Sequence, residues 1–181
     1  GQPTTPASAK EPLTADSVVA RVNGIAIRVK EVSVNRYDAK FESVRKQLTP
    51  EEFRKAQMQI FKRELPRHVE HLLLAEALRS MLDPEQQKLV SQHIDELFEQ
   101  EVVRMMKHSG VDSRDELEQE AARQGTTLAL LKQEFERQLM ATEYLRSKTN
   151  GPLDEDARAR ILKDLRAQAD VWTIFDDEAD N

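Results

Sequence analysis

The sequence predicts a mainly α-helical protein with a small β element formed by two N-terminal strands and one C-terminal strand. Strong helix formers (Glu, Lys, Arg, Gln, Leu and Ala) dominate the composition, and apolar residues recur at steps of three and four over most of the chain. Short β-branched runs lie near its two ends, VVARVNGIAI at 18–27 and VWTIF at 171–175. Because a lone two-stranded ribbon is marginal in water, we expect the two ends to meet in one sheet. The alternative is that 171–175 forms the last turn of a helix.

The chain length of 181 residues favours one folded domain. Pro, Thr, Ser and Ala dominate its beginning, so residues 1–17 are predicted to be a disordered linker or tail. The domain is expected at 18–176, with a core at 18–148 and a completing helix and strand at 154–176. Residues 177–181 are predicted to be a solvated acidic tail.

The charge and composition of the chain exclude several function classes. The net charge is −6, with Lys and Arg spread among Asp and Glu, so nucleic acid is not an expected partner. There is no cysteine, which excludes disulfides and Cys-based zinc sites. No apolar run approaches the roughly 18 residues of a membrane span. Gly1 at the start predicts a processed or engineered end from which a targeting segment has been removed.

The N-terminal half predicts a hairpin followed by three helices. Asn23-Gly24 suits a type I′ turn between the first two strands. A helix is expected at 29–48, and a second begins after the cap Thr49-Pro50 and ends or kinks at Pro66. The third, 67–82, has a wide apolar face and is expected to be central. The predicted apolar faces of these three helices are Tyr37, Phe41, Val44 and Leu48; Phe53, Ala56, Ile60 and Phe61; and Val69, Leu72, Leu73, Leu74, Leu78 and Leu82.

Capping signals divide the second half into four helices. They are expected after Asp83 (84–108), after Ser113 (to Gly125), after Thr126 or Thr127 (to 148) and after Asp154. The predicted apolar stripes of the first, third and fourth of these are Ile94, Leu97, Phe98, Val102, Met105 and Met106; Leu128, Leu131, Phe135, Leu139, Thr142 and Leu145; and Ile161, Leu162, Leu165 and Ala169.

Candidate chemistry is sparse. Glu64, His68 and His71 share one helical face, a spacing that can seat a metal ion. However, HExxH is missing and Pro66 interrupts the helix, so solvated histidines on a charged face are the favoured interpretation. His93 and His108 stand alone. The five glycines form no phosphate loop and no G-x-S-x-G occurs, so no catalytic residue, metal or cofactor is predicted.

A binding surface is a stronger prediction for this sequence than a catalytic or metal site. Methionine adapts its shape to varied apolar partners. The alternative is that the methionines and their apolar neighbours on these helices are ordinary core residues, because a helical stripe normally faces its own domain. The predicted client-facing residues are Met105, Met106, Leu130, Phe135, Met140 and Tyr144.

Three segments together resemble the N-terminal chaperone domain of the SurA, PrsA and PpiD type. They read VVARVNGIAIRVKEV, LPRHVEHLLLAEALRSM and GVDSRDELEQEAARQGTTLALLKQEFERQLMATEYLRSK. ARARILKDLRAQADVWTIFD resembles the C-terminal segment with which that family completes its N-terminal domain. The likeness runs from Val18 to Asp176. The positions that match the family's most distinctive passage are Asp115, Glu118, Gly125, Thr127, Leu131, Lys132 and Leu139.

The resemblance implies an ATP-independent, periplasmic or otherwise extracytoplasmic chaperone that binds unfolded or membrane-destined polypeptides. Relatives usually carry a parvulin-type isomerase domain before the last helix, whereas only 149–153 lie there in this chain, and a Gly-Gly loop is missing. Arg28 also replaces the Ser or Thr that caps the first helix in many relatives. Isomerase activity is therefore not expected. Two alternatives stay open. The first is a structural or assembly module that dimerises, with domain swapping as one route, or docks a fixed partner through the same helices. The second is an isomerase whose catalytic domain was lost or removed.

Overall fold

A computed structural model describes residues 11–32 and 43–177. The strands are β1 (Val18–Val22), β2 (Ile25–Arg28) and β3 (Val171–Thr173). The helices are α1 (Val29–Val32), α3 (Pro50–Met81), α4 (Pro84–Ser109), α5 (Arg114–Arg123), α6 (Leu128–Lys148) and α7 (Glu155–Gln168). Helices therefore dominate, and the predicted fold class, mainly α with a small β element, is confirmed.

The sheet joins the two ends of the domain in the order β2-β1-β3, with antiparallel pairing throughout. Asn23 and Gly24, with φ of 50° and 81°, make the tight turn between β1 and β2. β3 pairs with the other edge of β1, where Arg21 lies opposite Trp172 and Val22 opposite Val171. The strand expected at 171–175 thus forms, although it ends at Thr173.

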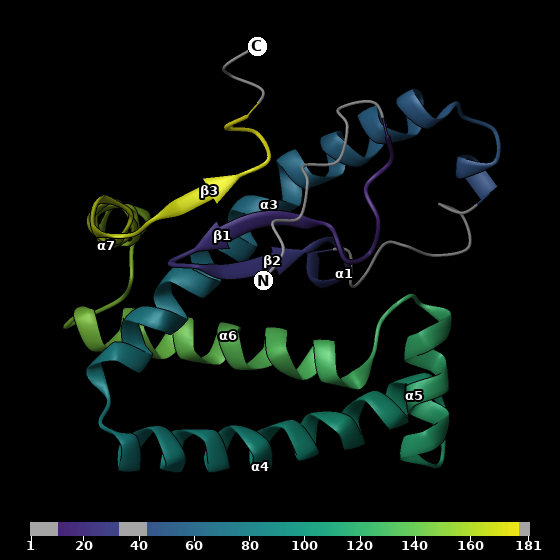
Figure 1. Cartoon of the computed structure of the whole chain (residues 1–181). Coiled ribbons are helices and arrows are strands. Elements are labelled where there is room, and N and C mark those ends of the chain that lie inside the picture. Colours follow the sequence, from purple (N-terminus) through teal and green to yellow (C-terminus); the bar gives the residue numbers. More distant parts are fainter. Residues whose placement is uncertain (1–10, 33–42, 178–181) are drawn as a thin grey trace.

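Helix α3 is the element against which α1, β1, α6 and α7 pack. Its first half runs behind the sheet, and its second half passes beside α6 and α7 (Figure 1). Pro66 does not end it, so the predicted division into two helices is wrong. A proline inside a helix costs about 3 kcal/mol. Phe61, Leu65 and Val69 keep the same buried face on both sides of Pro66, and their burial offsets that cost.

Helices α4, α5 and α6 form an arm in which α4 and α6 run in opposite directions and α5 crosses their far end (Figure 1). The caps predicted for this region are present: Asp83 and Gln86 form a capping box before α4, Ser113 caps α5, and Thr127 caps α6. Gly110 ends α4 in the left-handed conformation, with φ of 66°.

Several predicted stripes and boundaries need correction. Of the stripe predicted for a helix at 29–48, Tyr37 and Phe41 lie outside the described residues, and Val44 is exposed. The helical turn that contains Val44 ends before Lys46, because the Thr49 cap starts a new helix soon after. On α6, Thr142 is exposed and Arg137 is buried, since that helix turns different faces to α3 and to α4. Asp177, the first residue of the predicted solvated tail, accepts a hydrogen bond from the Trp172 indole, and its neighbour Asp176 accepts one from the Thr173 amide.

The predicted linker 1–17 is too long by at least its last seven residues. Residues 1–10 lie outside the described part, but Leu13 is buried in the cluster between the sheet and α3. Gln57, which is 1% exposed, binds both backbone groups of Leu13: its Oε1 accepts from the amide N–H at 2.8 Å and its Nε2 donates to the carbonyl at 2.9 Å. The domain therefore includes residues 11–17.

Replacing Gln57 with Ala should lower the free energy of unfolding by about 2 kcal/mol, because two buried backbone groups of Leu13 lose their partners. Urea unfolding measures this, and hydrogen exchange of the Leu13 amide should become faster. Gln59→Ala, at an exposed position on the same helix, is the matched control and should change stability little. Equal losses in the two variants would contradict the role assigned to Gln57.

Candidate functional site

The six predicted client-facing residues do not form one exposed surface. Met140 and Tyr144 are only 4% and 7% exposed and belong to the apolar cluster of Leu74, Leu78 and Leu145. A freely exposed client contact is therefore the wrong interpretation of these two residues. Both belong to the face of α6 that is covered by α3, which the spacing of apolar residues alone does not reveal.

The other four residues are half-buried. Met105 and Met106 pack against a cluster of Phe98, Val102, Leu117 and Leu128 at the far end of the arm. Phe135 contacts this cluster as well as the one beside α3, and its ring lies 5.5 Å from that of Phe98. Leu130 is also half-buried. Their binding to clients remains a prediction.

A groove of about 220 Å³ lies where the end of α3 meets α4 and α6. Val90, Ile94 and Met140 give it apolar walls, and Ser91 and Gln87 are exposed at its edge on α4. Its remaining lining residues are Arg79, Leu82 and Glu136. Four of its eight lining residues are thus apolar and four are polar or charged, so the groove can offer both kinds of contact to a side chain.

Arg79 connects the polar and apolar walls of this groove. Its Nη2 donates to Glu136 Oε1 at 3.0 Å and lies 3.6 Å from Met140 Sδ, while its Nη1 is paired with Glu76. The guanidinium is therefore already engaged by two carboxylates.

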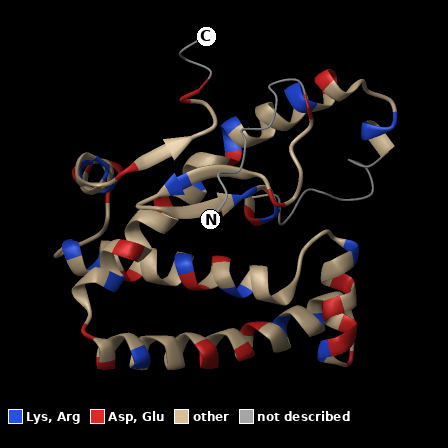
Figure 2. Cartoon of the chain, in the orientation of Figure 1, with Lys and Arg blue, Asp and Glu red and all other residues tan. Residues whose placement is uncertain are grey.

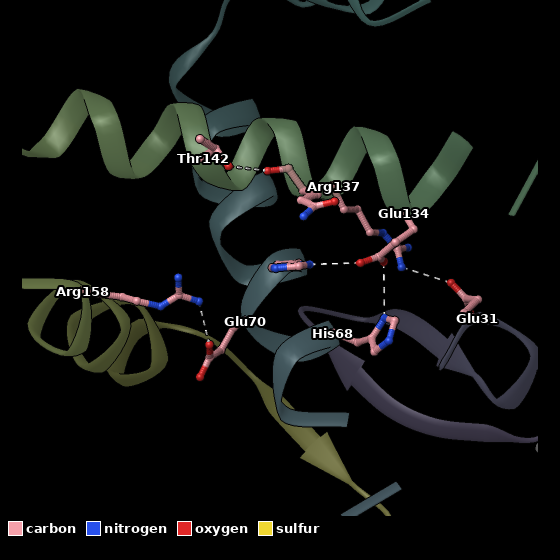
Figure 3. A network of polar contacts seen from close by, with 9 residues as sticks. Glu31, His68, Glu70, Glu134, Arg137, Thr142 and Arg158 are labelled. Atoms are coloured by element: carbon pink, nitrogen blue, oxygen red, sulfur yellow. Dashed lines mark hydrogen bonds and ion pairs between the residues drawn. The ribbon is translucent and has the colours of Figure 1, made fainter. Parts of the chain in front are cut away.

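A polar cluster lies between α3 and α6, beside the sheet. The Glu134 carboxylate contacts both histidines of α3: His68 Nδ1 lies 3.3 Å from Oε2, and His71 Nδ1 lies 3.1 Å from Oε1 (Figure 3). Burial of this carboxyl would raise its pKa, but the two imidazole hydrogen bonds and the histidine charges outweigh it, so the pKa of Glu134 is lowered from 4.5 to about 2. The cluster therefore favours ionised Glu134.

His68 also has a buried ring nitrogen, Nε2, with no hydrogen-bond partner. If Nδ1 carries the proton that is donated to Glu134, Nε2 is left as an acceptor. One ring nitrogen of His68 is therefore satisfied by Glu134, while the other is buried without a partner.

A buried ion pair continues the cluster to the sheet. Arg137 Nη1 on α6 lies 3.1 Å from Glu31 Oε1 on α1, and the two side chains are 10% and 9% exposed (Figure 3). Glu31 Oε2 also accepts from the Arg28 amide at 2.6 Å. With its amide turned to match its neighbours, Gln133 donates to Glu31 at 3.0 Å and accepts from Arg137 at 3.2 Å. These contacts fix α6 to the sheet.

The metal site considered for Glu64, His68 and His71 is not assembled. Glu64 pairs with Arg63 at 3.0 Å, whereas both histidines turn to Glu134. Within 11–32 and 43–177, no group of three or more His, Cys, Asp and Glu side chains is placed to hold a metal ion. His93 and His108 are exposed.

Solvated histidines were also the wrong expectation, because His68 is 4% exposed. The sequence did carry a signal for its burial. His68 continues the spacing of Phe61, Leu65 and Leu72, all of which face the core. The burial of Arg137 had no comparable signal, because its partner Glu31 is 106 residues away.

In the part of the chain that the structure describes, no helix combines the length and the apolar character needed to cross a bilayer.

Comparisons of the chain with protein-family models, with curated proteins and with solved structures give no match. The resemblance to SurA, PrsA and PpiD therefore stays a prediction from sequence motifs.

Proposed function

We propose that this protein is an ATP-independent, extracytoplasmic chaperone that binds unfolded polypeptides through the groove between α4 and α6. The observation that carries the proposal is the incomplete cover of α4. Of its 26 residues, only Ile94, Phe98 and Val102 are buried. Apolar side chains thus remain partly accessible along a long helix, as expected of a surface that receives apolar partners.

The shape of the groove supports the same function. Met140 lies in its wall, and the flexible thioether can adjust to different side chains. The groove is open to solvent at the exposed residues Ser91 and Gln87, so a side chain of a bound polypeptide can enter without unfolding the domain. Such binding needs no nucleotide, because apolar burial provides its driving force.

Replacing Ser91 with Trp should block the groove and weaken the binding of an unfolded model protein by about tenfold, equivalent to 1.4 kcal/mol. Ser91 is exposed, so the indole fills the groove without removing a core contact. Suppression of aggregation and anisotropy of a labelled unfolded client measure the effect. Gln92→Trp, at an exposed position outside the groove lining, is the matched control. Client binding by Ser91→Trp at the wild-type level would remove the groove assignment.

The alternative function, an assembly module, is favoured by two exposed apolar residues on α4, Leu89 and Val103. Light scattering distinguishes it from the chaperone. A stable dimer that is disrupted by charged residues at these two positions, together with absent client binding, would establish the assembly module instead.

A further inference from the structure

The segment at 11–13 is held against α3 in the way that a bound peptide is held. These three residues belong to no helix or strand. Gln57 Oε1 accepts from the Leu13 N–H at 2.8 Å, and its Nε2 donates to the Leu13 carbonyl at 2.9 Å. Arg54 Nη1 donates to the Glu11 carbonyl at 3.1 Å. All three hydrogen bonds are therefore made to backbone groups, which almost every residue of any polypeptide offers.

One apolar side chain completes this contact. Leu13 is 8% exposed and belongs to the buried cluster that also contains Phe61 of α3 and Val19 of β1. Glu11 and Thr14 are exposed, and the residue between Glu11 and Leu13 is half-buried. The Leu13 site, defined here as Gln57, Arg54 and this apolar cluster, therefore recognises a backbone and one apolar side chain. Backbone bonds that give affinity and a pocket that gives specificity are the usual division in peptide recognition.

Residues 14–17 are anchored separately from Leu13. The Lys30 amide of α1 donates to the Ala15 carbonyl at 3.0 Å, and the Lys30 ammonium pairs with Asp16 at 2.8 Å. Figure 2 shows charged positions on α1 and on the first half of α3, the two helices that hold these neighbouring parts of the chain. The contacts with α1 do not involve Leu13, so they can persist when Leu13 leaves its site.

We propose that residues 11–13 occupy a peptide-binding site and can be exchanged there for an unfolded segment of another polypeptide that carries a leucine-like side chain. The inference goes beyond the proposed function, because the groove between α4 and α6 takes no part in it. Gln57 is 1% exposed and loses two hydrogen bonds when the segment leaves. A replacement must therefore offer the N–H and the carbonyl of one residue together with an apolar side chain.

The test opens the Leu13 site in the full chain with Leu13→Asp, because a buried apolar site disfavours a carboxylate. The probe is a labelled, end-capped peptide with the sequence of residues 11–15, and fluorescence anisotropy measures its binding. In the wild type the tethered segment competes at an effective concentration on the order of mM, so the peptide should bind Leu13→Asp about tenfold more tightly. Ala15→Asp adds the same charge at an exposed position and should behave like the wild type.

Two further changes test how the peptide is recognised. A methyl group on the leucine nitrogen of the peptide removes the N–H that donates to Gln57, and should weaken binding to Leu13→Asp about tenfold. Adding Gln57→Ala to Leu13→Asp should weaken binding at least as much. Adding Gln59→Ala, at an exposed position of the same helix, should have little effect. A peptide with Asp in place of its leucine should not bind.

The outcomes separate this inference from the proposed function. Equal binding by the wild type and Leu13→Asp, or no binding by folded Leu13→Asp at about 1 mM peptide, overturns the exchange of residues 11–13. If circular dichroism shows that Leu13→Asp is unfolded, Leu13→Ala takes its place, and the same two results decide. Ser91→Trp tests the groove between α4 and α6 alone, so either proposal can fail while the other stands.

Discussion

Replacing Arg137 with Ala is expected to lower the free energy of unfolding by about 3 kcal/mol, because it leaves a buried carboxylate without its cation. Arg137 and Glu31 are 3.1 Å apart, and both side chains are about nine-tenths buried. In this variant Glu31 still accepts a hydrogen bond from the Arg28 amide. We therefore expect the loss of stability to lie near the lower end of the range that is typical for a broken buried ion pair. Urea unfolding followed by fluorescence of Trp172, the single tryptophan, measures the change.

An exposed arginine provides the control. Arg123 pairs with Glu120 on the surface of α5, and its side chain is 68% exposed, so Arg123→Ala should change stability by less than about 1 kcal/mol. In a double-mutant cycle, Glu31→Gln combined with Arg137→Met should destabilise less than the sum of the two single changes. A loss below about 1 kcal/mol for Arg137→Ala would contradict this account of how α6 is held to the sheet.

The second large effect is expected in acid. Since the pKa of Glu134 is about 2 in the folded protein against 4.5 ordinarily, ionised Glu134 stabilises the fold above pH 4.5, and this stabilisation is lost as the pH falls from 4.5 towards 2. Its size is on the order of 2–3 kcal/mol. The groups that contact this carboxylate are the His68 and His71 side chains of α3.

Glu134→Gln isolates the contribution, because it keeps the shape of the side chain and removes the titration. The stability of the wild type should fall more steeply than that of Glu134→Gln between pH 4.5 and 2, and the two curves should converge at the acidic end. Glu143→Gln, at an exposed position on the same helix, should follow the wild type. Parallel curves for wild type and Glu134→Gln would show that the two histidines do not stabilise the ionised carboxylate.

Local signals predicted much of this fold. Asn23-Gly24 determined the hairpin, and Thr49, Asp83 and Asp154 marked where helices begin, because turns and caps depend on residues close in sequence. The return of β3 to β1 was also predictable, since a two-stranded ribbon needs a further partner. These features required no knowledge of how the helices pack.

The sequence-based predictions failed where the structure depends on packing between elements that are far apart in the chain. Pro66 looked like a helix end, but burial on both sides of it keeps α3 continuous. An apolar stripe also does not identify its partner, so the sequence alone left both a client and the protein's own core open for Met140 and Tyr144, although a stripe normally faces its own domain. The groove needs residues from α3, α4 and α6 together, and no single segment encodes it.

The position of β1 between β2 and β3 affects how this chain is made. Val18–Val22 leaves the ribosome about 150 residues before Val171–Thr173, which at roughly 5–20 residues per second is on the order of ten seconds or more. Throughout that interval the nascent hairpin presents unpaired backbone groups along one side, and the strand of a neighbouring chain can occupy them. Correct closure therefore depends on this chain's own last strand arriving before a competitor does.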